Sequence, residues 1–242
     1  MHIIEGKNLT FSYEDKPERH VIRNMSFGVE EGSITVLLGL SGCGKSTLCQ
    51  IICGIIPGCI GGELEGELYF RGEDITDMKV NERALKTGYV MQDPDRQMIA
   101  TTVEDELAFG PENLCMDPAE IREKADSIMK MLNITHLAGR TPGQLSGGEK
   151  QVVAIGAILA LDPEVIVMDE PMSHLDSLGR ELVCSAVKEL KKAGKTVIIV
   201  EQDYEIVDFA DKWMIMEEGV IKKEGTPAAM ISGGPCFDTF CR

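Results

Sequence analysis

The sequence predicts an α/β fold in which a mostly parallel sheet carries helices on its faces, with antiparallel strands at the N-terminus and an inserted helical subdomain. Short runs of branched aliphatic residues recur along the 242-residue chain and end in polar residues or glycines. Amphipathic segments of helical length separate several of these runs, as in sheets with crossover helices. Residues 92–153 break this alternation and read as mainly helical.

The first part of the core is predicted to begin with antiparallel strands. Residues 1–32 alternate weakly and contain the turn-rich segment YEDKPERH. The run SITVLLG is typical of a buried strand, and a glycine-rich turn and the helix KSTLCQIICGI follow it, with an expected end near Pro57. The segments GELYFRGEDI and TGYVMQ predict two more strands, the first turning tightly at Gly72.

The clearest helix of the insert is DPAEIREKADSIMKMLN. Asp117 is its expected N-cap, Pro118 occupies its first position, and Glu120 has the spacing of a capping box. Strand–helix alternation resumes with EVIVMDE, LGRELVCSAVKELKKAG and KTVIIV, and KWMIM and GVIKK predict a closing hairpin. We therefore expect one domain over 1–242, with a core of 1–91 and 154–242 and a helical subdomain of 92–153.

The composition excludes several functional classes. Forty acidic against 24 basic residues give a net charge of −16, which argues against non-specific nucleic-acid binding and predicts no nucleic-acid partner. No apolar stretch is long enough to cross a bilayer, and the first residues lack the pattern of a signal peptide. The eight cysteines form no C-x-x-C pair, so reduced thiols are expected rather than a zinc site. The tail GGPCFDTFCR gives no functional signal.

A phosphate-binding loop is the first chemical motif. The segment GLSGCGKST matches G-x-x-x-x-G-K-[ST] between a predicted strand and a helix, where backbone amides and the helix N-terminus can surround a phosphate. Lys45 adds a full positive charge, and the Ser46 hydroxyl is expected to bind Mg²⁺. Cys43 is expected to serve simply as a small side chain in the loop; the alternative is a thiol whose pKa the helix N-terminus lowers. The expected nucleotide-binding residues of the loop are Gly39, Leu40, Ser41, Gly42, Cys43, Gly44, Lys45, Ser46 and Thr47.

A second motif supplies the carboxylates that such a loop needs. Asp169 ends the hydrophobic run VIVMD and is expected to hold Mg²⁺, and Glu170 follows it, where it can polarise an attacking water. Together with the loop, this pair predicts a nucleoside triphosphatase site that uses Mg²⁺. The fold expected for it is a P-loop NTPase with a RecA-like core.

The segment LSGGEKQ at 145–151 resembles the signature of ABC ATPases, and the resemblance covers essentially the whole chain. It implies a head-to-tail dimer with a second ABC ATPase subunit, identical or related, in which each signature completes the partner's nucleotide site. The signature residues carried over are Ser146, Gly147, Gly148 and Glu149. The resemblance also implies that Gln92 contacts Mg²⁺ and that Tyr13 stacks on adenine, while SHLD at 173–176 matches the family's D-loop.

A narrower resemblance concerns MQDPDRQMIATTVEDELAFGPEN, which is similar to the matching region of ATPases that power energy-coupling factor importers. It implies two membrane partners, a transmembrane coupling protein and a substrate-capturing protein, and a peripheral location on the cytoplasmic face of the membrane. Basic helices of the coupling protein would meet acidic residues of this chain; the alternative is a solvated acidic face. The candidate acidic residues are Asp93, Asp95, Glu104, Asp105 and Glu106.

The segment VIIVEQD places Gln202 where the family normally has a histidine that touches the γ-phosphate. Gln202 is therefore the second expected catalytic residue beside Glu170. A neutral amide donates a hydrogen bond but carries no positive charge, so we expect attenuated hydrolysis. The alternative is that the glutamine serves adequately.

The sequence favours an ATP-hydrolysing subunit of a membrane importer for a metal ion or vitamin, whose substrate is not encoded in this chain. A soluble ABC ATPase that is not tied to transport is the main alternative. A DNA-repair ATPase of this family would need a long coiled-coil insertion, and the insert of about 60 residues is too short for one.

Overall fold

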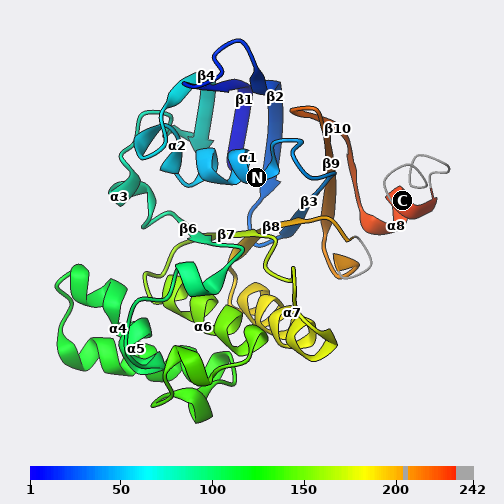
Figure 1. The fold of residues 1–242 in the computed structure, drawn as a ribbon. Helices are drawn as coiled ribbons and strands as arrows, with labels where there is room; N and C mark the ends of the chain where they lie inside the picture. Colours follow the sequence, from blue (N-terminus) through cyan, green and yellow to red (C-terminus); the bar gives the residue numbers. More distant parts are fainter. Residues whose placement is uncertain (204–206, 233–242) are drawn as a thin grey trace.

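The computed structural model describes residues 1–203 and 207–232 and confirms the predicted α/β fold. The tail at 233–242 lies outside the described residues. Figure 1 shows an upper lobe with an antiparallel sheet, a central sheet, and a lower lobe of helices. The antiparallel sheet has the order β2 (His20–Glu30), β1 (His2–Tyr13), β4 (Gly62–Phe70) and β5 (Glu73–Asp74).

The central sheet has six strands. Its order is β10 (Val220–Gly225), β9 (Lys212–Glu217), β3 (Ile34–Leu38), β8 (Thr196–Glu201), β7 (Val165–Asp169) and β6 (Thr87–Val90). All its neighbouring pairs are parallel except the hairpin of β9 and β10. Since parallel strands end at the same edge, the segments after β3, β6, β7 and β8 meet there.

Helices occupy both sides of the central sheet. On the side of the antiparallel sheet lie α1 (Lys45–Ile52), α2 (Ile55–Gly58) and α3 (Val80–Arg83). The lower lobe in Figure 1 contains α4 (Val103–Asn113), α5 (Pro118–Met131), α6 (Gly147–Leu159) and α7 (Ser177–Lys192). Short 3₁₀ turns (η1, Pro94–Arg96; η2, Thr135–Leu137; η3, Pro142–Gln144) connect these helices, and α8 (Pro227–Ser232) follows the last strand.

The central sheet divides the hydrophobic core into two. Along β7, Ile166 and Met168 pack into the cluster that includes the lower helices, whereas Val165 and Val167 pack toward α1 and the antiparallel sheet. Successive side chains of a strand point to opposite faces, so a strand covered on both sides must be apolar throughout. This explains why these runs show no polar alternation.

Local details refine three predictions. The first helix ends at Ile52 rather than near Pro57, because Gly54 adopts a left-handed conformation (φ 73°) and α2 begins as a separate turn. Asp117 caps α5 as expected, but its carboxylate accepts from the Ala119 amide rather than from the Glu120 amide that a capping box would use. The hairpin after β9 is confirmed, and positive φ at Glu218 and Gly219 gives the backbone twist that a two-residue hairpin needs.

Two glycines let α6 and α7 approach closely. A Cβ at Gly148 would lie 2.5 Å from the Cα of Gly179, so any side chain at 148 would collide with backbone. A displaced α7 would also shift the loop that precedes it. Gly148 therefore fixes how the loop before α7 meets the rest of the molecule.

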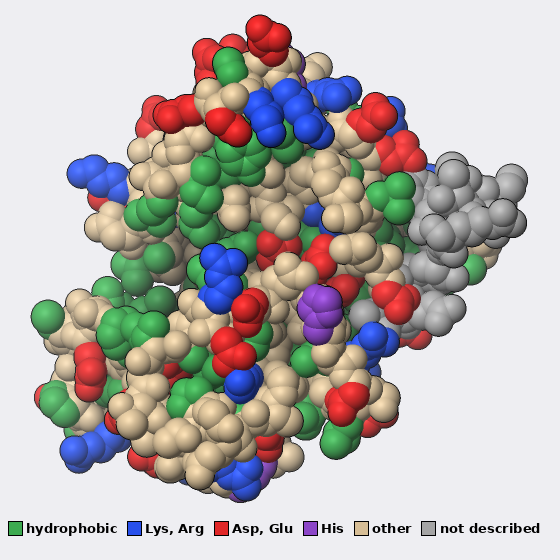
Figure 2. All heavy atoms as spheres, in the orientation of Figure 1, with side chains coloured by type: hydrophobic (Ala, Val, Ile, Leu, Met, Phe, Trp, Pro, Cys, Tyr) green, Lys and Arg blue, Asp and Glu red, His purple; other side chains and the backbone are tan. Residues whose placement is uncertain are grey.

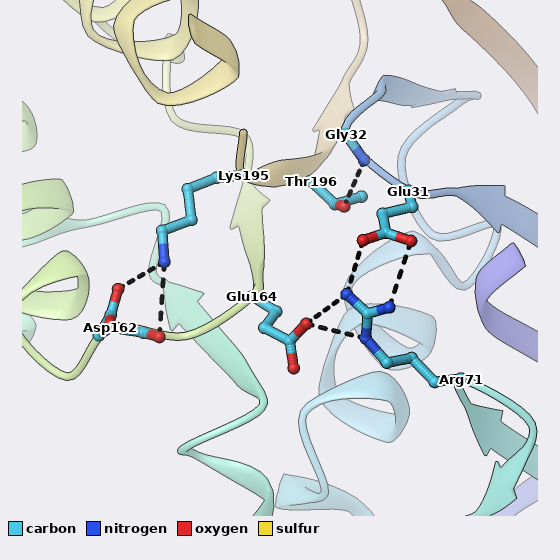
Figure 3. A network of polar contacts seen from close by, with 7 residues as sticks. All are labelled: Glu31, Gly32, Arg71, Asp162, Glu164, Lys195 and Thr196. Carbon is cyan, nitrogen blue, oxygen red and sulfur yellow. Dashed lines mark hydrogen bonds and ion pairs between the residues drawn. The ribbon is translucent and has the colours of Figure 1, made fainter. Parts of the chain in front are cut away.

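A polar network joins the two sheets at the edge where β7 and β8 begin (Figure 3). Arg71 follows β4, and its guanidinium donates to Glu31 at 2.6 and 3.2 Å and to Glu164 at 2.6 and 2.8 Å. Beside it, the Gly32 amide donates to the Thr196 hydroxyl at 2.9 Å. Glu31 belongs to the antiparallel lobe and Glu164 precedes β7, so this network holds the two sheets together at the edge opposite the carboxyl ends of the strands.

Candidate functional site

A cavity of about 860 Å³ lies at the carboxyl edge of the parallel strands. It brings together most of the residues expected from the sequence, although they come from five separate segments. Those that line it are Tyr13, Ser41, Gly42, Gly44, Lys45, Ser46, Thr47, Gln92, Glu170 and Gln202. Figure 2 shows acidic side chains exposed in the middle of this face, between the upper and lower lobes.

The loop after β3 curls because its glycines adopt backbone geometry closed to other residues. Gly42 and Gly44 have φ of 79° and 107°, and a Cβ at Gly44 would lie 2.9 Å from the Val21 carbonyl oxygen. The Lys45 side chain is only 4% exposed and donates from Nζ to the carbonyls of Gly39 (2.7 Å) and Leu40 (3.1 Å). The loop thus holds its own lysine over the cavity.

Asp169 lies behind the loop, at the end of β7. One carboxylate oxygen accepts from the Ser46 hydroxyl and the other from the Tyr89 hydroxyl, each at 2.9 Å. Burial raises the pKa of Asp169, and the two hydroxyl hydrogen bonds oppose the rise. A hydroxyl, a carboxylate and an amide oxygen are hard donors that suit Mg²⁺, which binds proteins through one or two carboxylates and completes its shell with water and phosphate. These residues therefore fit the ion.

Glu170 is the most constrained carboxylate of the site. Its φ of 46° lies in the left-handed region, which side chains other than glycine seldom adopt. The amide of Gln202 donates to one carboxylate oxygen at 2.7 Å, and that of Gln92 donates to the other at 3.1 Å. Lys45 Nζ lies 3.9 Å from the first of these oxygens. The structure therefore places both glutamines directly against the expected catalytic acid.

The tyrosine of β1 closes the other end of the cavity. The Tyr13 hydroxyl lies 2.8 Å from the Thr47 hydroxyl, and its ring packs edge-on against Phe11 at 4.9 Å between centroids. The nearby cavity wall includes Val21 and Arg19. An aromatic ring beside a phosphate loop can hold a planar base over its face.

The alternative of a lowered pKa for the Cys43 thiol is wrong. Burial raises its pKa, and this outweighs the lowering effect of the Lys45 charge. The side chain does not line the main cavity; it faces a second one of about 530 Å³, whose wall includes Leu40 and Met216. A helix N-terminus lowers a thiol pKa only where the thiolate remains solvated or paired, and Cys43 is half-buried.

The signature residues lie outside the cavity. Ser146 caps α6, accepting from the Glu149 amide at 3.3 Å, and Glu149 in turn accepts from the Ser146 amide at 2.7 Å. This last bond lowers the pKa of Glu149. Ser146 and Gly147 are exposed at the helix start, so this N-terminus faces solvent rather than the cavity of its own chain.

The structure also adds residues that the sequence did not single out as part of the site. The Tyr89 hydroxyl donates to Asp169, and this contact depends on the register in which β6 pairs with β7. Arg180 of α7 lines the cavity, and its Nε is buried without a hydrogen-bond partner among the described residues. Glu201 is 3% exposed and accepts from the Met172 amide at 3.0 Å. An acidic residue before Gln202 was the only sequence signal for any of these.

The prediction that Glu106 belongs to an acidic docking face is wrong. Glu106 is 5% exposed and accepts from the amides of Ile99 and Ala100, so it stabilises its own loop. Asp95 is exposed but pairs with Lys150 at 2.6 Å. A nearby groove of about 500 Å³ between α4 and α5 is lined by four acidic residues, by apolar residues and by one basic residue, Arg122. Its acidic residues are Glu104, Asp105, Glu112 and Asp126.

Comparison with known proteins identifies the family. The model of the ABC transporter family matches residues 22–173. A protein of Methanosarcina mazei named as an ABC transporter ATP-binding protein is 40% identical, over 90% of this chain but 38% of its own length. The chain thus spans about two fifths of that relative and of others like it. The energy-coupling factor transporter ATP-binding protein EcfA1 of Clostridium perfringens is 37% identical, over 96% of this chain and 82% of its own.

Solved structures agree. The structure of cbiO1 from Clostridium perfringens, described as part of the ABC transporter complex cbiONQ, superposes with a TM-score of 0.86 at 31% identity, covering 96% of this chain and 91% of its own. The ATP-binding cassette MJ0796, solved as a dimer in a post-hydrolysis state with ADP and Pi, gives 0.78 at 29% identity, covering 93% and 98%.

We predict that Glu201→Gln stabilises the fold at alkaline pH. Burial raises the pKa of Glu201 from 4.5 to about 7, so the unfolded chain releases this proton first as the pH rises. The wild type therefore loses stability between pH 4.5 and 7, whereas the variant does not. The variant's advantage should grow over this window to at most ~3 kcal/mol and stay constant above it. Urea unfolding followed by Trp213 fluorescence at several pH values measures it; a difference independent of pH would contradict the prediction.

Proposed function

The chain belongs to the ABC transporter family, and from this premise we propose that it binds and hydrolyses ATP to energise a membrane importer of the energy-coupling factor type, for a metal ion or vitamin. The observation that carries the proposal is the meeting of the phosphate loop, Glu170, Gln92 and Gln202 in one cavity, with Asp169 hydrogen-bonded to Ser46 of that loop. The two glutamines and Glu170 come from the ends of three different strands, and the hydrogen bonds between them support a single site in which all three act together.

ATP would lie along the loop with its base toward Tyr13 and its terminal phosphate toward Glu170. Backbone amides of the loop and Lys45 would bind the phosphates. Ser46, Gln92 and Asp169 would hold Mg²⁺, which neutralises charge on the β- and γ-phosphates when bound. The remaining loop residues, from Gly39 to Thr47, shape the phosphate cradle.

In the proposed reaction, a water oxygen bonds to the γ-phosphorus while the bond to the β–γ bridging oxygen breaks, giving ADP and phosphate. Glu170 accepts the water proton, for which it must exchange one of its present hydrogen bonds. The hydrogen bond from Gln202 is the one we expect Glu170 to lose, because the Gln202 amide can turn from Glu170 to a phosphoryl oxygen. Since that amide stays neutral, it stabilises the charged transition state less than a protonated histidine would.

The exposed signature supports a dimer as the working unit. Ser146, Gly147, Gly148 and Glu149 form a helix start outside the chain's own cavity. Its free amides would complete the site of a second ABC ATPase subunit, identical or related. The dimeric MJ0796 structure with ADP and Pi provides a precedent at the level of the family.

The importer assignment rests on the relatives and on the groove between α4 and α5. We propose that this groove receives a helix of a transmembrane coupling protein, with basic side chains against its acidic residues and apolar ones against its apolar residues. A substrate-capturing membrane protein would complete the assembly at the cytoplasmic face of the cell membrane. Within the described residues, no helix has the length and hydropathy to cross a bilayer.

A prediction for binding concerns Lys45→Ala. Removing the buried ammonium deletes charge-assisted bonds to phosphate, so the affinity for Mg-ATP should fall ~10- to 100-fold. Isothermal titration calorimetry measures it, with Lys130→Ala on the exposed side of α5 as the control. Equal affinities for Lys45→Ala and the wild type would contradict the assigned site.

A prediction for hydrolysis concerns position 202. Gln202→His should raise kcat, because an imidazolium adds charge at the γ-phosphate, and Gln202→Ala should lower it by removing the donor. We expect each step to change kcat by roughly tenfold, part of the ~10²–10³ that a full oxyanion donor supplies. Steady-state phosphate release measures the order His, Gln, Ala. An unchanged rate in the histidine variant would show that the glutamine is not attenuating.

A prediction for assembly concerns the groove. Charge reversal of Glu112 and Asp126 to lysine should abolish co-purification with the membrane proteins co-expressed with this chain, because two repulsive contacts replace two attractive ones. Glu63→Lys with Glu65→Lys, on exposed β4, makes the same charge change away from the groove. ATPase activity of the free chain should survive in both. Intact assembly of the groove variant would favour the soluble alternative or another docking face.

A further inference from the structure

The turn that carries Glu170 is held to β8 at both ends. Before it, the Glu170 amide donates to the Val200 carbonyl at 3.0 Å. After it, the Met172 amide donates to the Glu201 carboxylate at 3.0 Å. Only Pro171 separates the two donor residues, Glu170 and Met172. Their acceptors, Val200 and Glu201, are consecutive residues of β8, so β8 holds the turn on both sides. The first bond uses backbone groups alone, but the second depends on one side chain.

This second bond matters because the turn is strained. Glu170 has a φ of 46°, a conformation that is unfavourable for a residue with a side chain and persists only where its surroundings enforce it. Proline at 171 further restricts the residue before it. Without the Glu201 carboxylate, the Met172 amide is a buried donor that loses its partner, and the turn is held at one end only.

On the basis of the proposed ATPase activity, we propose that Glu201 is a positioning residue: its carboxylate clamps the Glu170–Pro171–Met172 turn to β8 and so aims Glu170 at the attacking water. Glu201 lines the same cavity as Glu170, and the next residue, Gln202, reaches Glu170 at 2.7 Å. Side chains at 201 and 202 therefore act on the turn from two sides, one through its backbone and one through its carboxylate.

The charges around Glu201 predict how the clamp responds to pH. The negative charges of Glu170 and Asp203 raise the pKa of Glu201, and the charge of Glu201 in turn raises the pKa of Cys184 of α7. Burial, the largest cause, raises the pKa of Glu201 to about 7, while amide hydrogen bonds from Met172 and Gln202 oppose this rise. Lys45 and Arg180 are cations that line the same cavity. The ionised carboxylate is the stronger acceptor, so the clamp should tighten as the pH rises through about 7.

The test compares Glu201→Ala and Glu201→Gln in the full chain. The alanine variant should bind Mg-ATP within threefold of the wild type but show kcat ~10- to 100-fold lower, the scale of misplacing a reacting group. The glutamine variant, which still offers an oxygen to Met172, should recover most of this loss. At pH 6 it should match the wild type, and at pH 8 it should fall below it, because only the wild type gains from ionisation.

A readout independent of activity is hydrogen exchange of the peptide that contains the Met172 amide, which should speed up in Glu201→Ala and return toward wild type in Glu201→Gln. The matched control is Glu106→Gln, since Glu106 is also buried and accepts from backbone amides, but in the helical lobe. Its kcat, pH profile and exchange at Met172 should be unchanged.

The outcomes separate this inference from the proposed function. Wild-type protein that binds and hydrolyses ATP, with Glu201→Ala equal to it in kcat and in exchange, overturns the positioning role alone. The same pH effect in Glu106→Gln overturns it too, because a general loss of buried charge would then explain the data. A wild type that neither binds nor hydrolyses ATP overturns both.

Discussion

Four carboxylates gathered at the ends of two neighbouring strands set the constraint on this site. Asp169 is the last residue of β7 and Glu170 follows it, while Glu201 is the last residue of β8 and Asp203 lies two residues beyond. Like charges this close cannot all remain ionised in a partly buried cavity without compensation. The structure supplies a different compensation to three of them, and these differences separate their roles.

Two hydroxyls bind Asp169, which keeps an ionisable oxygen ligand beside the loop in spite of burial. Glu170 accepts hydrogen bonds from two neutral side-chain amides, and the Lys45 ammonium lies 3.9 Å away. Because the amides are neutral, either hydrogen bond can be replaced without moving a formal charge. Glu201 is compensated least and tends to retain its proton, as its pKa of about 7 shows. In the proposed site, a group that costs stability when it ionises yet holds the strained Glu170 turn is an instance of stability given up for function.

The two lobes provide the rigidity that the site requires. Alternate residues of β3, β7, β8 and β9 pack into separate cores, so the ends of these strands cannot shift independently of either lobe. The Arg71 network fixes the far edge of the sheet, and the contact of Gly148 with Gly179 fixes the loop before α7. The start of α6, which carries the signature residues, and the phosphate loop are thereby held apart on one chain, and in the proposed dimer a second subunit brings the two kinds of element together.

The sequence alone determined the α/β fold, the phosphate loop, the strand-end acids and the family, because these depend on local patterns: apolar runs, fixed glycine spacing and helix caps. It could not place Tyr89 on Asp169 or the Glu201 carboxylate on the Met172 amide, because each contact joins segments far apart in the chain and depends on strand register. It misjudged Glu106 for a related reason. Whether a polar group is solvated or buried is decided by what packs over it, and that is a property of the tertiary structure.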